Sequence, residues 1–141
     1  MTVATIGYEE ATPPRLIAAL REAGVAVLVD VRALANSRRP GFAKRALSAA
    51  LEEAGIAYLH LPALGTPAAG RQAVRAGDPA TMRRIFGAHL EGGEAQAALA
   101  GLRDLARRQP VCLLCLEADP AQCHRTLVAE ALDLPIRHLA P

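Results

Sequence analysis

Two stretches of the chain are apolar at almost every position, and they constrain the fold more than any other feature. The first is Val25–Val31 and the second is Val111–Leu116. A strand with one face in water alternates apolar and polar residues, whereas a strand that is apolar throughout has both faces covered, as in a parallel sheet. These stretches therefore predict a parallel sheet with helices on both faces.

The rest of the chain predicts strands and helices in alternation. Three further short apolar segments are expected to be strands: Thr2–Gly7, Ile56–Leu61 and Ile136–Leu139. Stretches with a helical apolar stripe lie between the strands. They follow Thr12-Pro13-Pro14, span Lys44–Ala54, follow Asp78-Pro79, span Glu94–Arg108 and follow Asp119-Pro120. This order is typical of the α/β class. We expect one α/β domain over residues 1–141, a three-layer sandwich whose open sheet is mainly parallel.

The segment Pro62–Gly77 shows neither pattern. It holds three glycines and two prolines in sixteen residues, and it carries Arg71 and Arg75. Loops of this length are usually functional or mobile. We therefore interpret the segment as a long surface loop.

Composition excludes several classes of protein. With 141 residues, 52% hydrophobic and 21% charged, the chain fits a globular domain and not a disordered tail, a collagen-like repeat or a disulfide scaffold. No apolar run approaches the roughly 20 residues that span a bilayer. The first residues lack the basic and apolar regions of a signal peptide. We expect a cytoplasmic protein without membrane contact, whose three cysteines form no structural disulfide.

The charge pattern gives weak support to nucleic-acid binding. The net charge is only +2, although fifteen of the sixteen basic residues are arginines. The Arg38-Arg39 pair and the segment with Arg71 and Arg75 favour such binding. The four aromatic residues, two Tyr and two Phe, leave little surface for base stacking. A non-catalytic nucleic-acid-binding module therefore remains an alternative that we do not favour.

Polar side chains gather where the expected strands end. Because ligands of open α/β sheets bind beyond the carboxyl ends of the strands, we expect these side chains to form a pocket for a small anion, a phosphate or a nucleotide. The expected ligand-binding residues are Tyr8, Asp30, Arg32, Ser37, Arg38 and Arg125. The expected catalytic residues are Cys115, Glu117, Cys123 and His124.

The segment from Cys115 to Arg125 holds the densest set of reactive groups. It predicts a strand-to-helix turn, and the N–H groups that start a helix favour an anion. There Cys123 would be a nucleophile with a lowered pKa, His124 a general acid or base, and Arg125 a bidentate anion clamp. A structural turn that only joins strand to helix is the alternative. Likewise, Asp30-Val31-Arg32 has an alternative interpretation as a local buried salt bridge.

The three cysteines allow three chemical interpretations. Cys112, Cys115, Cys123 and His124 match zinc in the number and type of ligands, but Cys112 and Cys115 are three apart on a strand and point to opposite faces. The second interpretation is a catalytic loop of the phosphatase or rhodanese type. Nine residues separate Cys115 from Arg125, however, more than phosphatases use, and none is glycine. The third is an anion site specific to this fold. We expect no metal and no cofactor.

Several motifs carry a family resemblance. They are Thr5–Tyr8, Val29–Arg32 with Ser37-Arg38, Gly55–Tyr58, Leu61–Gly65, and Leu113–Glu117 followed by Cys123-His124-Arg125. In this order, over nearly the whole chain, they resemble the family known as domain of unknown function 488. The resemblance implies a small cytoplasmic prokaryotic α/β protein without a settled activity. One departure is that Glu9 and Glu10 follow Tyr8, where the family often has a hydroxyl residue.

Overall fold

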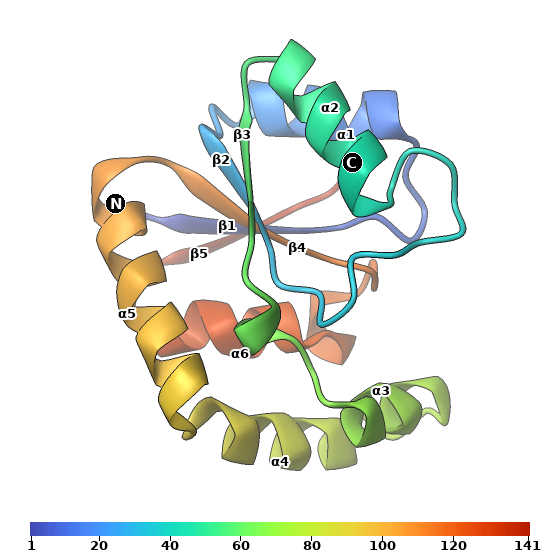
Figure 1. Ribbon diagram of the computed structural model, residues 1–141, viewed down its shortest axis with the longest axis vertical. Coiled ribbons are helices and arrows are strands. Elements are labelled where there is room, and N and C mark those ends of the chain that lie inside the picture. Colours follow the sequence, from blue (N-terminus) through green and yellow to red (C-terminus); the bar gives the residue numbers. More distant parts are fainter.

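Five strands form one sheet, and every neighbouring pair is parallel, in the computed structural model, which describes residues 1–141 (Figure 1). The order across the sheet is β3-β2-β4-β1-β5. The strands are β1 Val3–Gly7, β2 Val27–Asp30, β3 Ala57–His60, β4 Val111–Cys115 and β5 Ile136–Leu139. The α/β class is confirmed, and the sheet is parallel throughout.

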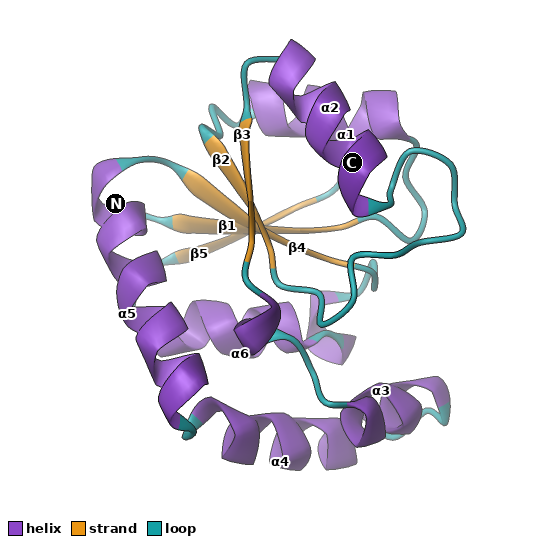
Figure 2. Cartoon of the chain, viewed as in Figure 1, coloured by secondary structure: helices purple, strands orange, loops and turns teal.

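Helices cover both faces of the sheet (Figure 2). On one face lie α1 (Pro13–Glu22) and α2 (Lys44–Glu53), and on the other lie α5 (Gly93–Arg108) and α6 (His124–Ala131). A pair of helices, α3 (Ala68–Arg75) and α4 (Pro79–Leu90), extends the second layer beyond the edge of the sheet. No helix combines the length and the apolar character that crossing a membrane requires.

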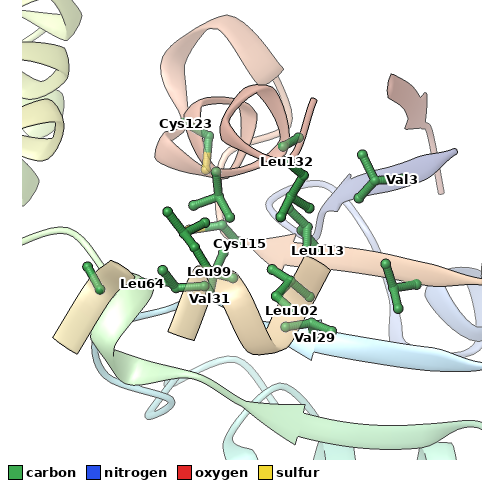
Figure 3. Packing of buried hydrophobic residues seen from close by; sticks show 14 of the residues in the cluster. Val3, Val29, Val31, Leu64, Leu99, Leu102, Leu113, Cys115, Cys123 and Leu132 are labelled. Atoms are coloured by element: carbon green, nitrogen blue, oxygen red, sulfur yellow. The ribbon is translucent and has the colours of Figure 1, made fainter. Parts of the chain in front are cut away.

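The central strand β4 divides its side chains between two apolar cores. Cys112 and Leu114 pack with the helices α1 and α2, while Leu113 and Cys115 pack with α5 and α6 (Figure 3). All five residues of β4 are buried. This explains why the sequence of the strand is apolar without alternation: successive side chains enter alternate cores, and both cores are apolar.

The connections leave the sheet in opposite directions beside β4. The helices that follow β1 and β2 pack on one face, whereas α6, which follows β4, packs on the other. Such a reversal opens a crevice at the carboxyl ends of neighbouring strands, where open α/β sheets bind ligands. The turns after β1, β2 and β4 all meet at this point.

The expected long loop at Pro62–Gly77 was wrong. The segment forms a short 3-10 helix η1 (Pro62–Leu64) and the eight-residue helix α3. Two of its three glycines serve close contacts, because a Cβ at Gly65 would lie 2.2 Å from Ala33 Cα, and one at Gly70 would lie 2.3 Å from a methyl group of Thr66. The third, Gly77, follows α3 with a positive φ of 77°, which favours glycine. Pro67 precedes the first turn of α3, where it interrupts no hydrogen bond.

The expected start of the last helix also needs correction. Asp119 and Pro120 begin only a 3-10 turn, η2 (Pro120–Gln122), in which the Asp119 carboxylate accepts a hydrogen bond from the N–H of Ala121. The helix α6 starts later, at His124, and Cys123 is its N-cap residue. The sequence Cys123-His124-Arg125 therefore lies directly at the start of the helix.

Candidate functional site

A pocket with a volume of about 310 Å³ lies beyond the carboxyl ends of β2 and β4. That volume is at the lower end of the range of about 300–1,000 Å³ typical of small-molecule sites. Its walls include residues from the strand ends and from α3 and the turn before it. They include Tyr8, Arg32, Cys115, Glu117 and His124 on the sheet side, and Thr66, Arg71 and Arg75 on the helix side. The structure thus brings the segments around positions 30 and 120 into one cavity.

Arg32 reaches this pocket but is fully engaged by internal partners. Its guanidinium forms a buried salt bridge with Asp30, in which Nη2 and Oδ2 are 2.7 Å apart, and it also donates to the Phe42 carbonyl and to the Tyr8 hydroxyl. The Tyr58 hydroxyl donates to the same Asp30 carboxylate. Burial opposes the charge of Arg32, but the hydrogen bond with Asp30 raises its pKa further above the ordinary value. The geometry matches the buried salt-bridge interpretation of Asp30-Val31-Arg32.

Arg125 does not line the pocket. Its side chain is 1% exposed, and Nη1 donates to the carbonyl oxygen of Glu117 over 2.5 Å. That carbonyl passes directly over Gly7, where a Cβ atom would lie 1.9 Å from it. Arg125 therefore joins the turn between β4 and α6 to the end of β1, and it lies outside the pocket in which an anion was expected.

Ser37 and Arg38 also lie outside the pocket. The Ser37 hydroxyl accepts a hydrogen bond from the N–H of Arg39, and Arg38 is exposed. The neighbouring Arg39 donates to the backbone carbonyls of three residues after β1 and stacks over the rings of Tyr8 and Phe42. Arg39 thereby pins the loop after β2 to the loop after β1, which the sequence pattern did not reveal.

Two thiols and one imidazole meet beside the pocket. Nδ1 of His124 lies 3.6 Å from Sγ of Cys115 and 4.0 Å from Sγ of Cys123. The opposite ring nitrogen, Nε2, is 2.7 Å from the carbonyl oxygen of Val31. The ring of Phe86 packs edge-on against the imidazole, with centroids 5.0 Å apart. Cys112 belongs to the other core and takes no part.

The thiols of this cluster differ in acidity. The hydrogen bond to Cys123 and burial raise the pKa of Cys115 well above its ordinary value. Burial opposes ionisation of Cys123 as well, but hydrogen bonds from Cys115 and His124 lower its pKa. For His124, burial is outweighed by the hydrogen bond and charge of Cys123, so its pKa is raised. The cluster thus favours negative charge on Cys123 and positive charge on the imidazole.

Glu117 contributes a carboxylate to the same pocket. Burial, followed by the charge on Cys123, raises its pKa to about 7. Its Oε2 atom is buried and has no hydrogen-bond partner. An unpartnered buried carboxylate oxygen is unfavourable and indicates a place where a proton, a cation or a ligand completes the contacts.

Arg71 and Arg75 were not expected among the pocket residues, because the sequence of their segment suggested a loop. Both line the pocket from α3. Their spacing was the available signal, since residues four apart lie on the same face of a helix.

The comparisons with known proteins give one match. The family model described as Domain of unknown function DUF488 matches residues 12–132. No curated protein and no solved structure matches the chain.

Proposed function

The chain belongs to the DUF488 family of domains of unknown function, and we propose that it binds a small phosphate-bearing ligand in the pocket beyond β2 and β4. The ligand would lie between the α3 side of the pocket and the sheet side, where Cys115, Glu117 and His124 line the wall and would contact it. The volume of about 310 Å³ suits a small metabolite better than a long polymer.

The pair Arg71 and Arg75 is the observation that carries this proposal. Both side chains line the pocket from α3, one helical turn apart. Arg71 is held in place because its Nη1 donates to the Thr66 carbonyl over 2.7 Å. Arg75 has no carboxylate partner, since the one salt bridge of the chain joins Arg32 to Asp30. Guanidinium groups match phosphate oxygens in planar, bidentate geometry, so this wall favours an anion.

The charges of the pocket are divided between its walls. The cations without counterions come from α3, whereas the carboxylate of Glu117 comes from the turn after β4. A ligand with one anionic end and one neutral or polar end would match both walls. This arrangement replaces the anion contacts first expected from Arg38 and Arg125 with contacts from Arg71 and Arg75.

The nucleic-acid alternative has less support. Tyr8, Phe42 and Phe86 are buried, and the hydroxyl of Tyr58 is bonded to Asp30. Only the half-buried Tyr58 leaves any aromatic surface open, which is little for the base stacking on which sequence-tolerant single-strand binding relies.

The proposal is tested by titrating inorganic phosphate into the protein at low ionic strength, with a chloride salt of matched ionic strength as reference. We expect Arg75→Ala to weaken phosphate binding about tenfold, which corresponds to the loss of one charge-assisted hydrogen bond of about 1.5 kcal/mol. Arg107→Ala, an exposed change at the end of α5 with the same effect on net charge, is the matched control and should leave binding unchanged. Equal losses in both variants, or no binding above chloride, would overturn the proposal.

A further inference from the structure

We propose that Cys115, Cys123 and His124 form a binding site for a zinc-like divalent metal ion at the sheet-side wall of the pocket. The two sulfur atoms and one ring nitrogen of the three residues lie within 4.8 Å of one another, and all three side chains are buried. Thiolates and an imidazole are the ligands that zinc prefers in proteins.

The distances are close to those of a tetrahedral site. With zinc–sulfur bonds of about 2.3 Å and zinc–nitrogen bonds of about 2.0–2.1 Å, tetrahedral ligand atoms lie roughly 3.5–3.8 Å apart. The two sulfur–nitrogen distances are 3.6 Å and 4.0 Å. Shifts of a few tenths of an ångström would bring both of these pairs to the required spacing. The two sulfur atoms lie within 4.8 Å of each other, so they would have to approach by up to about 1 Å to reach a tetrahedral separation.

The orientation of His124 supports a metal ligand. The carbonyl oxygen of Val31 can only accept a hydrogen bond, so the Nε2 that lies 2.7 Å from it carries a proton. A metal ion that displaces the proton from Nδ1 would find the lone pair of this nitrogen directed at it, because Nδ1 is the ring atom that faces both sulfur atoms. Metal-binding histidines typically donate their other ring N–H to a carbonyl or carboxylate in this way.

The fold holds the three ligands on rigid elements. Cys115 is the last residue of β4, and Cys123 and His124 occupy the N-cap and first position of α6. Cys123 is 2% exposed, and the ring of Phe86 covers one side of the imidazole. Ligands that are fixed before binding lose little conformational freedom when the metal arrives.

The fourth position of such a site faces the pocket. Cys115 and His124 both line the pocket, as does Glu117, whose buried Oε2 has no partner. Three protein ligands with one open position are typical of catalytic zinc sites, in which the open position takes water or substrate. That the open position meets the ligand rests on the proposed function, whereas binding of the metal itself does not.

The opposite orientations of Cys112 and Cys115, which count against zinc in the sequence, exclude only Cys112 from the site. Cys112 and Cys115 do point to opposite faces of the sheet. A site remains without Cys112, because Cys123 at the start of α6 lies close to Cys115 on the face of the sheet that α5 and α6 cover. Cys112 is thus a buried cysteine of the same strand that lies outside the site, and it provides a matched control.

The test is direct titration of the reduced full-length protein with cobalt(II) and zinc(II), without any anionic ligand. We expect one ion per chain, thiolate-to-cobalt charge-transfer absorption, and displacement of cobalt by zinc. Cys115→Ala and Cys123→Ala should each weaken zinc binding by more than about 100-fold, because they remove a direct ligand. Cys112→Ala should bind cobalt with an unchanged spectrum.

A wild-type measurement keeps the proposal falsifiable if a cysteine variant fails to fold. Zinc should slow alkylation of Cys115 and Cys123, mapped residue by residue, more than it slows alkylation of Cys112, which is protected only by the general stabilisation of the fold. Absence of cobalt charge transfer, or an equal loss of metal binding in Cys112→Ala, would overturn the proposal. Because phosphate is absent throughout, failure here leaves the phosphate-binding result independent.

Discussion

The imidazole of His124 donates a hydrogen bond from Nε2 to the carbonyl oxygen of Val31 over 2.7 Å. This bond joins the start of α6 to the residue directly after β2, although 93 positions separate them in the sequence. It therefore fixes the relative position of the two segments that form the sheet-side wall of the pocket.

Loss of this bond should destabilise the fold. In His124→Ala, the buried carbonyl of Val31 loses its partner, so we expect the free energy of unfolding to fall by about 1–3 kcal/mol. Urea denaturation in the presence of a metal chelator measures this value without a contribution from bound metal. A change of less than about 0.5 kcal/mol, the range of neutral surface substitutions, would show that the bond does not hold the wall.

The buried salt bridge between Asp30 and Arg32 should contribute strongly to stability. Asp30→Asn leaves the guanidinium of Arg32 buried without a counterion, and we expect a loss of about 3–5 kcal/mol. The exposed change Glu52→Gln is the control and should stay within about 0.5 kcal/mol. If Asp30→Asn lowered the free energy of unfolding no more than the control does, the ion pair would not stabilise the fold.

Gly7 should tolerate no side chain. The Cβ of Gly7→Ala would lie 1.9 Å from the Glu117 carbonyl, so the turn that carries Glu117 must shift, and both the free energy of unfolding and phosphate binding should fall. The matched control is Gly101→Ala in the interior of α5, where a Cβ meets nothing within 4 Å. That control should raise stability by about 0.5–1 kcal/mol. Similar effects of the two substitutions would contradict this close contact.

The N-cap of α4 should make stability depend on pH in the acid range. Hydrogen bonds from the hydroxyl and N–H of Thr81 lower the pKa of Asp78 below its ordinary value. Protons bind more readily in the unfolded state, so this contribution is complete above the ordinary aspartate pKa of about 4 and is lost as pH falls through the lowered value. Thermal melting of wild type and Asp78→Ala should therefore differ at neutral pH and converge in strong acid. An unchanged difference down to the lowest pH would contradict the capping role.

Much of the fold could be predicted because the strands carry their own signal. The apolar stretches at Val25–Val31 and Val111–Leu116 contain β2 and β4, and Ile136–Leu139 is β5. The glycines and prolines of Pro62–Gly77 suggested a loop, but in the structure they allow close packing and precede the start of a helix. Local patterns cannot distinguish these uses, because the deciding contacts come from distant residues such as Ala33.

The candidate site was predictable only in outline. The rule that ligands lie beyond strand ends brought Arg32, Cys115, Glu117 and His124 together, and all four line one pocket. The rule gives no side-chain direction, so it could not show that Arg125 turns towards the Glu117 carbonyl. It also could not show that Cys123, rather than Cys112, meets Cys115.

The proposed ligand site requires an open pocket between the arginines of α3 and the ends of β2 and β4. The most direct measurement is a crystal structure of the protein grown in phosphate. We predict electron density for an anion in contact with Arg71 and Arg75, in the same cavity as Cys115 and His124. A structure with this cavity closed by side chains, or with phosphate bound only elsewhere on the surface, would contradict the account.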